Sequence, residues 1–547
     1  HNFLPGENVE KQLIVINNCR ETVTCDCRWS VSLPHALTGS KEVAIPTGQQ
    51  HRIPLRFELP AALPAGTYQL EANFKFDNGK TQTDSFSIHV MQRPKARRVN
   101  AKIALFDPKG ETAALLNAMD IPHKSVDADA DLSAYEILIV GKSALTVDRA
   151  APSITRVRDG LKVLVFEQTA DVLEKRFGFR TAEYGLRRVF GRVSDHPLLR
   201  GIEPEHLRDW RGEASILPAR LDYRLRPRYG PTVDWCGMPV TRLWRCGNRG
   251  NVASVLIEKP ARGDFLPIID GGYSLQYSPL MEYREGKGIV LFCQMDVTAR
   301  TEDDPAARRL VRNIMRYIRA WRPAPRREVV YVGAPAGRQH LKSAGVSLAD
   351  HDRASLSINH VLVVGPGGRE LAGDSATIAT WLKAGGNLLA VGLDEQQANA
   401  FLPVKVRTKK TEHIAAYFEP FGFDSLLAGI GPADIHSREP RNIPLLSKGA
   451  KTIGDGILGR AENLNIVFCQ LAPWQFDRQK QNTKRTFRRI SFCLTRLLAN
   501  MGAVGSTPLL ERFGNPVNTS RAEKRWMEGL YLDVPEEWDD PYRFFRW

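Results

Sequence analysis

The chain has 547 residues, 43% of them hydrophobic and 25% charged, which excludes a mainly disordered, collagen-like or coiled-coil protein and predicts about three or four domains. Its 76 Lys and Arg residues outnumber 61 Asp and Glu, and the resulting net charge of +15 permits contact with acidic partners such as nucleic acid or sulfated polysaccharide. No apolar run approaches the roughly 20 residues that span a bilayer, so we expect no contact with a membrane.

Residues 1–92 have the pattern of antiparallel β structure. Several short segments are rich in β formers and alternate apolar with polar residues; they are 9–17, 28–33, 51–59, 67–75 and 83–90. Asp77, Asn78 and Gly79 supply a hairpin turn, because Asn and Gly tolerate positive φ. Short strands at this density predict an Ig-like β-sandwich.

Two later regions repeat one pattern of strands and helices. Each follows a basic, proline-bearing linker, at 93–98 and 322–327. Short apolar segments then correspond in order: 103–107 with 329–332, 136–141 with 360–365, 162–166 with 387–391, and 289–294 with 466–470. A basic helix follows each copy. Continuous apolar strands between helices predict parallel sheets covered on both faces. We therefore expect two doubly wound α/β domains, at 99–321 and 328–505.

Two aromatic-rich segments lie outside the repeat. The first domain carries an extra stretch at about 196–285, which we expect to form β-hairpins and loops. The last segment, 506–547, has little periodicity but many aromatic residues, which disordered tails lack. We predict that this C-terminal tail docks along a folded surface.

The α/β repeat resembles the class I glutamine amidotransferase-like fold. Enzymes of that class need a Cys nucleophile on the turn after a core strand and a His with a carboxylate after a later strand. Here the strand 162–166 runs into Glu167, and its copy 387–391 runs into Gly392, with no Cys at either turn. Cys293 and Cys469 lie inside strands and are interpreted as core residues. Neither copy is expected to be an active amidotransferase.

Cofactor and metal patterns are incomplete. Gly141-Lys142-Ser143 resembles the end of a P-loop, but Glu136 occupies the position of its first glycine. The acidic run 301–304 precedes Pro305, which is typical of a helix N-terminus. We expect no cofactor and no metal.

Three carboxylates are the candidates for catalysis, because open α/β sheets bind ligands beyond the carboxyl ends of their strands. They are Glu167, Asp296 and Asp394. The alternative is that each caps a loop. Four aromatic residues are candidates for stacking on sugar rings: Trp210, Trp235, Trp244 and Tyr273. Their alternative role is a small satellite core.

The domain order resembles the C-terminal half of large bacterial glycoside hydrolases of the family 2, β-galactosidase-like type; the amidotransferase-like domain also occurs in family 42 β-galactosidases, where it mediates trimerisation. The phrases that carry the resemblance are FLPGE at 3–7, EKQL at 10–13, FDPKGET at 106–112, HPLL at 196–199, DWRG at 209–212 and DVTARTEDDP at 296–305. In that family the catalytic glutamates lie on a TIM barrel, for which the segments assigned here leave no room. The resemblance therefore implies no catalytic residue in this chain, and a barrel upstream of His1 or on another chain.

These observations predict a non-catalytic accessory part of a glycoside hydrolase, which contacts oligo- or polysaccharide and supports a homo-oligomer or a catalytic partner. The resemblance also implies a secreted or periplasmic protein. Two alternatives remain open. One is a module that binds polyanions, either nucleic acid, for which no recognition motif is present, or sulfated glycan. The other is a stand-alone hydrolase that uses a strand-end carboxylate such as Glu167.

Overall fold

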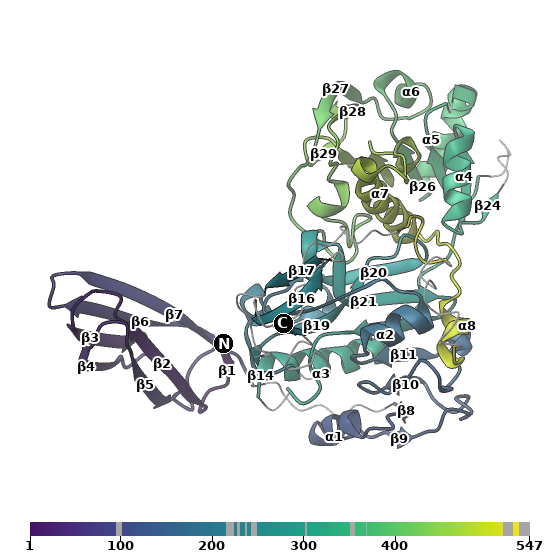
Figure 1. Ribbon diagram of the computed structural model, residues 1–547. Helices are drawn as coiled ribbons and strands as arrows, with labels where there is room; N and C mark the ends of the chain where they lie inside the picture. The colour runs from purple at the N-terminus through teal and green to yellow at the C-terminus, as the bar shows by residue number, and fades with distance from the viewer. Residues whose placement is uncertain are drawn as a thin grey trace.

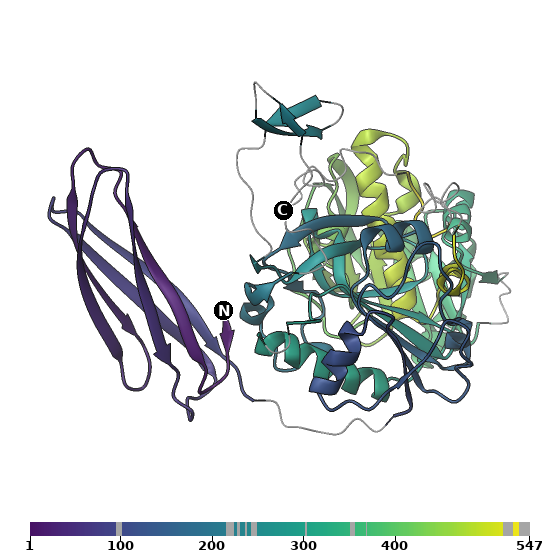
Figure 2. The same ribbon diagram turned by 60° about the horizontal axis from the view of Figure 1, so that its bottom comes forward.

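The computed structural model describes residues 1–93, 101–214, 249–300, 303–349, 356–367, 369–517 and 529–534, and the backbone of 224–226, 230–235 and 238–241. An N-terminal β unit stands beside a larger body, in which two α/β units are stacked on each other (Figure 1). Figure 2 shows the same separation from a second direction. Most of linker 93–98 lies outside the described residues.

The N-terminal unit consists of two sheets that share one core. One sheet has the order β1 (Asn2–Phe3), β7 (Thr81–Val90), β6 (Gly66–Phe76), β3 (Val23–Val31) and β4 (Leu37–Ile45); the other pairs β2 (Asn8–Ile16) with β5 (Gln50–Glu58). Alternate residues of β3 and β5 point inward, so Cys25 and Cys27 pack in the same core as Ile53 and Leu55. The turn at 77–79 joins β6 to β7, with Gly79 at φ +79°.

Two strands of this unit, the short β1 and the nine-residue β4, were not predicted. β4 has the sequence LTGSKEVAI, in which only Val43 and Ile45 are buried. Its polar residues and its glycine interrupt the alternation of apolar and polar residues that identifies a strand. Its pairing with β3 over nine residue pairs supplies the stabilisation that the local sequence lacks.

The first α/β unit is built on a mixed sheet. Its parallel part has the order β9 (Lys124–Ser125), β8 (Ile103–Phe106), β10 (Ile137–Val140), β11 (Lys162–Val165) and β22 (Gly288–Cys293). The helices are α1 (Glu111–Ala118), α2 (Ala170–Val172) and α3 (Pro305–Ala320). Along β10, Ile137 and Ile139 enter the core on one face, whereas Leu138 and Val140 enter the core on the other. Burial on both faces explains why these strands are continuous apolar runs.

The second α/β unit repeats this order. Its sheet contains β24 (Leu348–Ala349), β23 (Glu328–Val332), β25 (His360–Val364), β26 (Asn387–Val391) and β31 (Ile466–Cys469), extended by the antiparallel strands β30 (Leu458–Arg460) and β29 (Lys451–Ile453). Its helices are α4 (Pro335–Ser343), α5 (Ser375–Lys383), α6 (Glu395–Asn399) and α7 (Gln481–Asn500), and β27 (Arg407–His413) pairs with β28 (Arg441–Lys448). The strands that the sequence aligns as copies occupy the same places in the two sheets.

The stretch 196–285 contains antiparallel pairs of consecutive strands, but part of it belongs to the main sheet and does not form a separate insert. Its later part forms three antiparallel strands of the main sheet: β19 (Ala253–Glu258), β20 (Asp264–Gly271) and β21 (Tyr277–Glu285), of which β21 pairs directly with β22 and β19 with β12 (Thr181–Leu186). β13 (Phe190–Gly191) pairs with β20. The remainder forms small ribbons: β14 (Trp210–Glu213) with β18 (Arg249–Gly250), and β15 (Arg224–Arg226), β16 (Gly230–Trp235) and β17 (Met238–Thr241).

The C-terminal segment packs on the first α/β unit. α8 (Leu509–Gly514) places three apolar side chains in the core on one face of the first sheet, where Leu530 and Tyr531 join them. Phe513 stacks on Phe177 with ring centroids 5.1 Å apart and an angle of 14°. Residues 518–528 and 535–547 of the predicted tail lie outside the described residues.

Buried ion pairs connect the two α/β units. Asp270 of β20 accepts hydrogen bonds from Arg192 and from Lys259, whose Nζ lies 2.9 Å from its carboxylate and 3.5 Å from Asp434 of the second unit. A second bridge joins Arg496 of α7 to Asp264 of β20 at 2.9 Å. All six side chains are at most 5% exposed. Charges buried at this depth fix the contact, because either partner alone is costly to bury.

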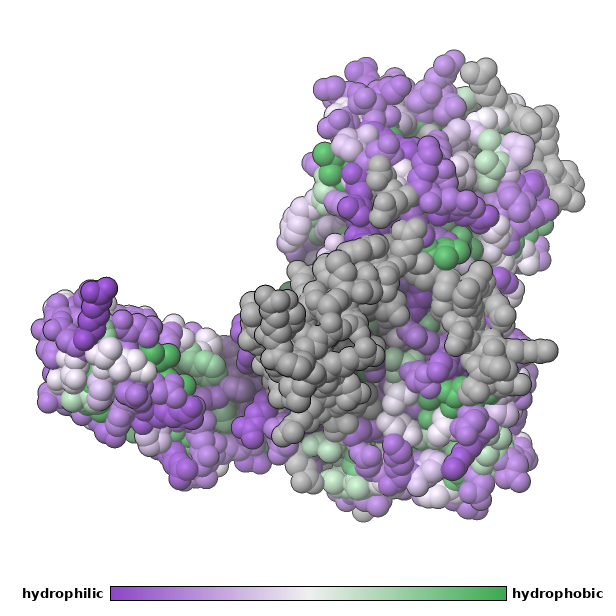
Figure 3. Space-filling view, in the orientation of Figure 1, coloured by the Kyte–Doolittle hydropathy of each residue, from purple (hydrophilic) through white to green (hydrophobic). Residues whose placement is uncertain are grey.

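The part of the α/β body's surface that Figure 3 colours by hydropathy is mostly hydrophilic, with apolar residues scattered among polar ones. Among the described residues, no helix combines the length and the apolar composition that crossing a bilayer requires.

Candidate functional site

Glu167 lies two residues after the end of β11, where the sheet could present a carboxylate to a ligand. Its side chain is instead buried, because the residue is only 1% exposed to solvent. Its Oε1 accepts the backbone N–H groups of Val297 and Thr298, each at 2.8 Å, and its Oε2 accepts the Thr298 hydroxyl at 2.9 Å. Glu167 thus joins the end of β11 to the loop that follows β22.

Asp296 lies beside Glu167 and is equally buried. Its carboxylate pairs with Arg300 at 2.8 Å. The Arg300 guanidinium also donates to three backbone carbonyls: those of Trp210, Arg211 and Asn251. The structure therefore brings Glu167 and Asp296 together, as two members of one buried network.

The environment of Glu167 favours its protonated form. Burial raises the pKa of this carboxyl from 4.5 to about 7, and the nearby Asp296 charge adds to the rise, against the opposing effect of the Thr298 hydrogen bonds. A carboxyl with a pKa near neutrality could exchange protons in a reaction. Here its oxygens are engaged by the protein, which leaves a ligand no access to them.

Asp394 belongs to the other sheet and is not part of this pair. It is exposed and caps α6: its Oδ1 accepts the Gln397 backbone N–H at 2.8 Å, and the Gln397 side chain returns a bond to the backbone N–H of Asp394. This capping box stabilises the helix end. Asp304 similarly accepts the Ala306 N–H at 2.9 Å at the start of α3.

The ends of the two repeat-equivalent strands β22 and β31 carry glutamine side chains that are bonded to the backbone. Gln294 follows β22; its side chain accepts the Gln168 backbone N–H and donates to the Gln168 carbonyl, both at 2.9 Å. The equivalent Gln470 follows β31 and donates to the Leu393 carbonyl at 3.0 Å. Cys293 and Cys469 are fully buried in their strands.

The aromatic candidates lie in different surroundings. Trp210 is fully buried, and its indole N–H donates to the His206 carbonyl at 2.8 Å, so no sugar ring can reach its face in this structure. Tyr273 is half-buried; the Arg485 guanidinium lies 5.4 Å from its ring centroid. The Trp235 side chain and Trp244 lie outside the described residues. The described part of the chain contains no cluster of three metal-ligating side chains.

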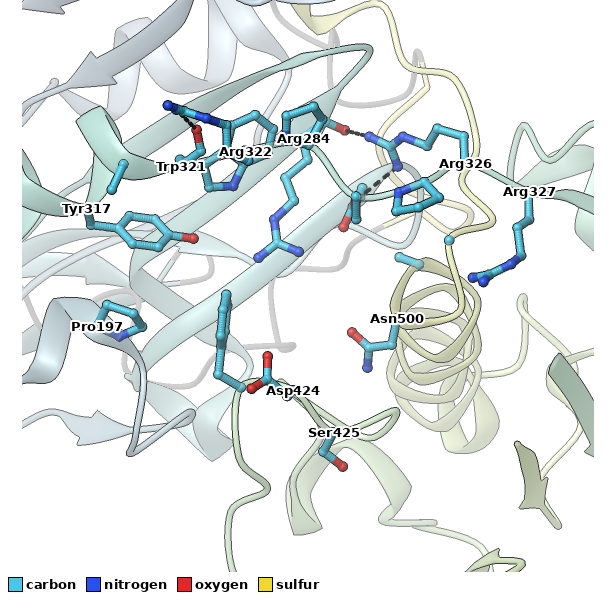
Figure 4. Close-up of a pocket in the computed structure, with 18 of the residues that line it drawn as sticks. Pro197, Arg284, Tyr317, Trp321, Arg322, Arg326, Arg327, Asp424, Ser425 and Asn500 are labelled. Carbon is cyan, nitrogen blue, oxygen red and sulfur yellow. Dashed lines mark hydrogen bonds and ion pairs between the residues drawn. The ribbon is translucent and has the colours of Figure 1, made fainter. Parts of the chain in front are cut away.

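A cleft between the two α/β units was not identified from the sequence. It has a volume of about 610 Å³ and is lined by residues from α3, β21, the linker 322–327, the loop 423–425 and the end of α7. Figure 4 shows Arg284, Tyr317 and Asp424 around its open centre. The basic linker was the one sequence signal for this feature, because the other walls come from distant segments.

No protein-family model and no curated protein matches this chain. Solved structures give only weak similarity. Spo0M, a sporulation control protein from Bacillus subtilis, is 17% identical over 16% of this chain and 44% of its own, with a TM-score of 0.13. A family 123 glycoside hydrolase from Clostridium perfringens is 13% identical over 21% of this chain and 27% of its own (TM-score 0.14). A β-glucuronidase from Bacteroides uniformis is 13% identical over 30% of this chain and 22% of its own (TM-score 0.15).

This chain therefore spans less than half the length of each of these structures. At such TM-scores the similarities establish neither a shared fold nor a shared activity.

The raised pKa of Glu167 predicts how stability depends on pH. Between about pH 4.5 and pH 7 the folded protein retains a proton that the unfolded chain releases, so the free energy of unfolding should fall as pH rises through this window. The full decrease is about 3 kcal/mol. Glu167→Gln keeps an acceptor for the two backbone N–H groups and cannot ionise. We expect urea unfolding at pH 5 and pH 8 to show a weaker pH dependence for this variant.

The matched control is Asp394→Asn, which replaces an exposed carboxylate by another good N-cap. Its unfolding free energy should follow the wild-type pH profile. A Glu167→Gln profile that coincides with the wild type would contradict the assigned environment of Glu167.

Proposed function

We propose that this chain is a non-catalytic, structural part of a carbohydrate-active enzyme. The observation that carries the proposal is that the polar side chains at the strand ends of both α/β units bond to the protein itself, at the edge where open sheets of this kind bind their ligands. In the first unit, Glu167 accepts hydrogen bonds from backbone N–H groups and Asp296 forms an ion pair with Arg300. In the second unit, Gln470 is bonded to the backbone and Asp394 caps a helix.

The rigid connection of the two α/β units supports the same role. Their contact contains buried ion pairs. Asp533 of the C-terminal segment also connects the two units, because it pairs with Arg180 of the first unit at 3.0 Å and with Arg488 of α7 at 2.6 Å. A body held in this way is suited to position other parts of an enzyme. The proposed partners are a catalytic domain or chain, further copies of this chain and an oligo- or polysaccharide substrate, in a secreted or periplasmic setting.

The test is the native mass of the protein purified from its source, measured together with the glycoside-hydrolysing activity of the same fractions. We expect the activity to elute with a particle heavier than the 61.3 kDa of this chain. The additional mass would be a catalytic domain, either in the same polypeptide or in a second polypeptide bound to it. A 61.3 kDa monomer without an associated glycosidase would reject the proposal.

A further inference from the structure

The cleft between the α/β units has the lining of a ligand site. Its volume of about 610 Å³ lies within the range of small-molecule pockets. Six arginines face it, against two aspartates; the arginines are Arg200, Arg284, Arg316, Arg322, Arg326 and Arg327. Such an excess of one charge in a concave site raises the local concentration of ligands of the opposite charge.

Two of these arginines are fixed by acidic neighbours. Arg284 binds the fully buried Glu282 through two nitrogens, at 2.8 and 2.5 Å. Arg326 pairs with Asp264 at 3.1 Å and donates to the Arg284 carbonyl at the same distance. The labelled side chains in Figure 4 show Arg284 directed into the cleft from its β-strand.

The other four arginines of the cleft are not paired with a carboxylate in the described part of the chain, so their positive charge can attract a ligand. Arg327 donates to two neutral carbonyls, those of Ile358 and Met501. Arg200, Arg316 and Arg322 are exposed, and within the described part of the chain none of the three forms an ion pair with a carboxylate. The cleft therefore carries positive charge that the protein itself does not neutralise.

The same cleft has an aromatic wall, of which Phe423 from the second unit is the half-buried member. Tyr317 and Trp321, one turn apart at the end of α3, are each only 8% exposed, and the Tyr317 ring lies edge-to-face with Phe423 at 6.5 Å. The Arg284 guanidinium lies 5.8 Å from the Phe423 ring. Asn313, Ser425 and Asn500 add polar groups to the lining. A half-exposed aromatic ring beside a few polar groups suits a ring compound that carries hydroxyl groups.

We infer that this cleft binds an anionic saccharide, whose carboxylate or sulfate group is held by the arginines while its ring lies against Phe423. Arginine is suited to this role because its planar guanidinium matches the geometry of such oxyanions. The anion part of the inference stands on the cleft alone, and the saccharide part rests on the proposed function.

The test is calorimetric titration of the native protein at low ionic strength with D-glucuronate, inorganic sulfate and glucose. We expect saturable binding of glucuronate, binding of glucose at least about tenfold weaker, and a loss of affinity when NaCl is raised, since salt screens exposed charges. Replacing the exposed pair as Arg200→Gln/Arg316→Gln should weaken glucuronate binding by about tenfold or more.

The control is Arg20→Gln/Arg52→Gln, which removes two exposed arginines of the N-terminal unit and should leave the affinity unchanged. Equal affinities of the two double variants, or no saturable binding of either anion, would overturn the inference. Sulfate binding as tight as glucuronate binding would reject the saccharide part alone. None of these results depends on whether the chain hydrolyses glycosides, so failure here is distinct from failure of the proposed function.

Discussion

Asp270→Ala should destabilise the α/β body by about 3–5 kcal/mol, because it removes one partner from a buried charge cluster. Asp270 is the carboxylate that Arg192 and Lys259 share. Without it, both cations remain buried, and Lys259 keeps only the more distant Asp434 among the ion pairs of this cluster. Urea unfolding followed by tryptophan fluorescence measures the change.

The control for this variant is an exposed ion pair. Glu10 and Arg56 of the N-terminal unit lie 3.7 Å apart and are both more than two-thirds exposed. Glu10→Ala should cost less than about 1 kcal/mol, as is usual for surface pairs. Similar effects of Asp270→Ala and Glu10→Ala would show that the interface is not held by its buried charges.

Phe513→Ala should cost about 3–5 kcal/mol, since it opens a cavity in a closed core. Phe513 is fully buried and stacks on Phe177, although it lies in a segment with little sequence periodicity. The expected loss reflects the role of α8 as part of the first unit's core. Thermal and urea unfolding of the purified variant measure it.

Tyr417→Ala provides the comparison, because this aromatic side chain is 75% exposed. It should change the free energy of unfolding by no more than about 0.5 kcal/mol. If Phe513→Ala were equally mild, the C-terminal segment would not be an integral part of the folded body.

Strands buried on both faces were the most predictable part of the fold. β10, β11, β25 and β26 have apolar runs that stand out from their surroundings. In contrast, β19 to β21 are buried too, but polar residues such as Glu258, Asp264 and Glu282 interrupt their apolar pattern. Glu258 and Asp264 are paired with arginines of the distant helix α7, which local sequence does not reveal, whereas Glu282 is paired with Arg284 of its own strand.

The candidate site was predictable in position but not in environment. The sequence placed Glu167 and Asp296 at strand ends, where the structure has them. Their burial depends on the loop that carries Val297 and Thr298 and on Arg300, which reaches back to the carbonyl of Trp210. Tertiary contacts of this kind also bury Trp210. The cleft is harder still to predict, because its walls meet only when both α/β units have folded and packed together.

The most direct test of the structural role assigned to the strand-end carboxylates is the rate of glycoside hydrolysis by the particle that contains this chain and its proposed catalytic domain, before and after Glu167→Gln. We predict equal turnover numbers for the two proteins at a pH where both are folded, because Glu167 binds the protein rather than a substrate. A loss of about a hundredfold or more, the size expected for removal of a general acid or base, would contradict this and make Glu167 a catalytic residue.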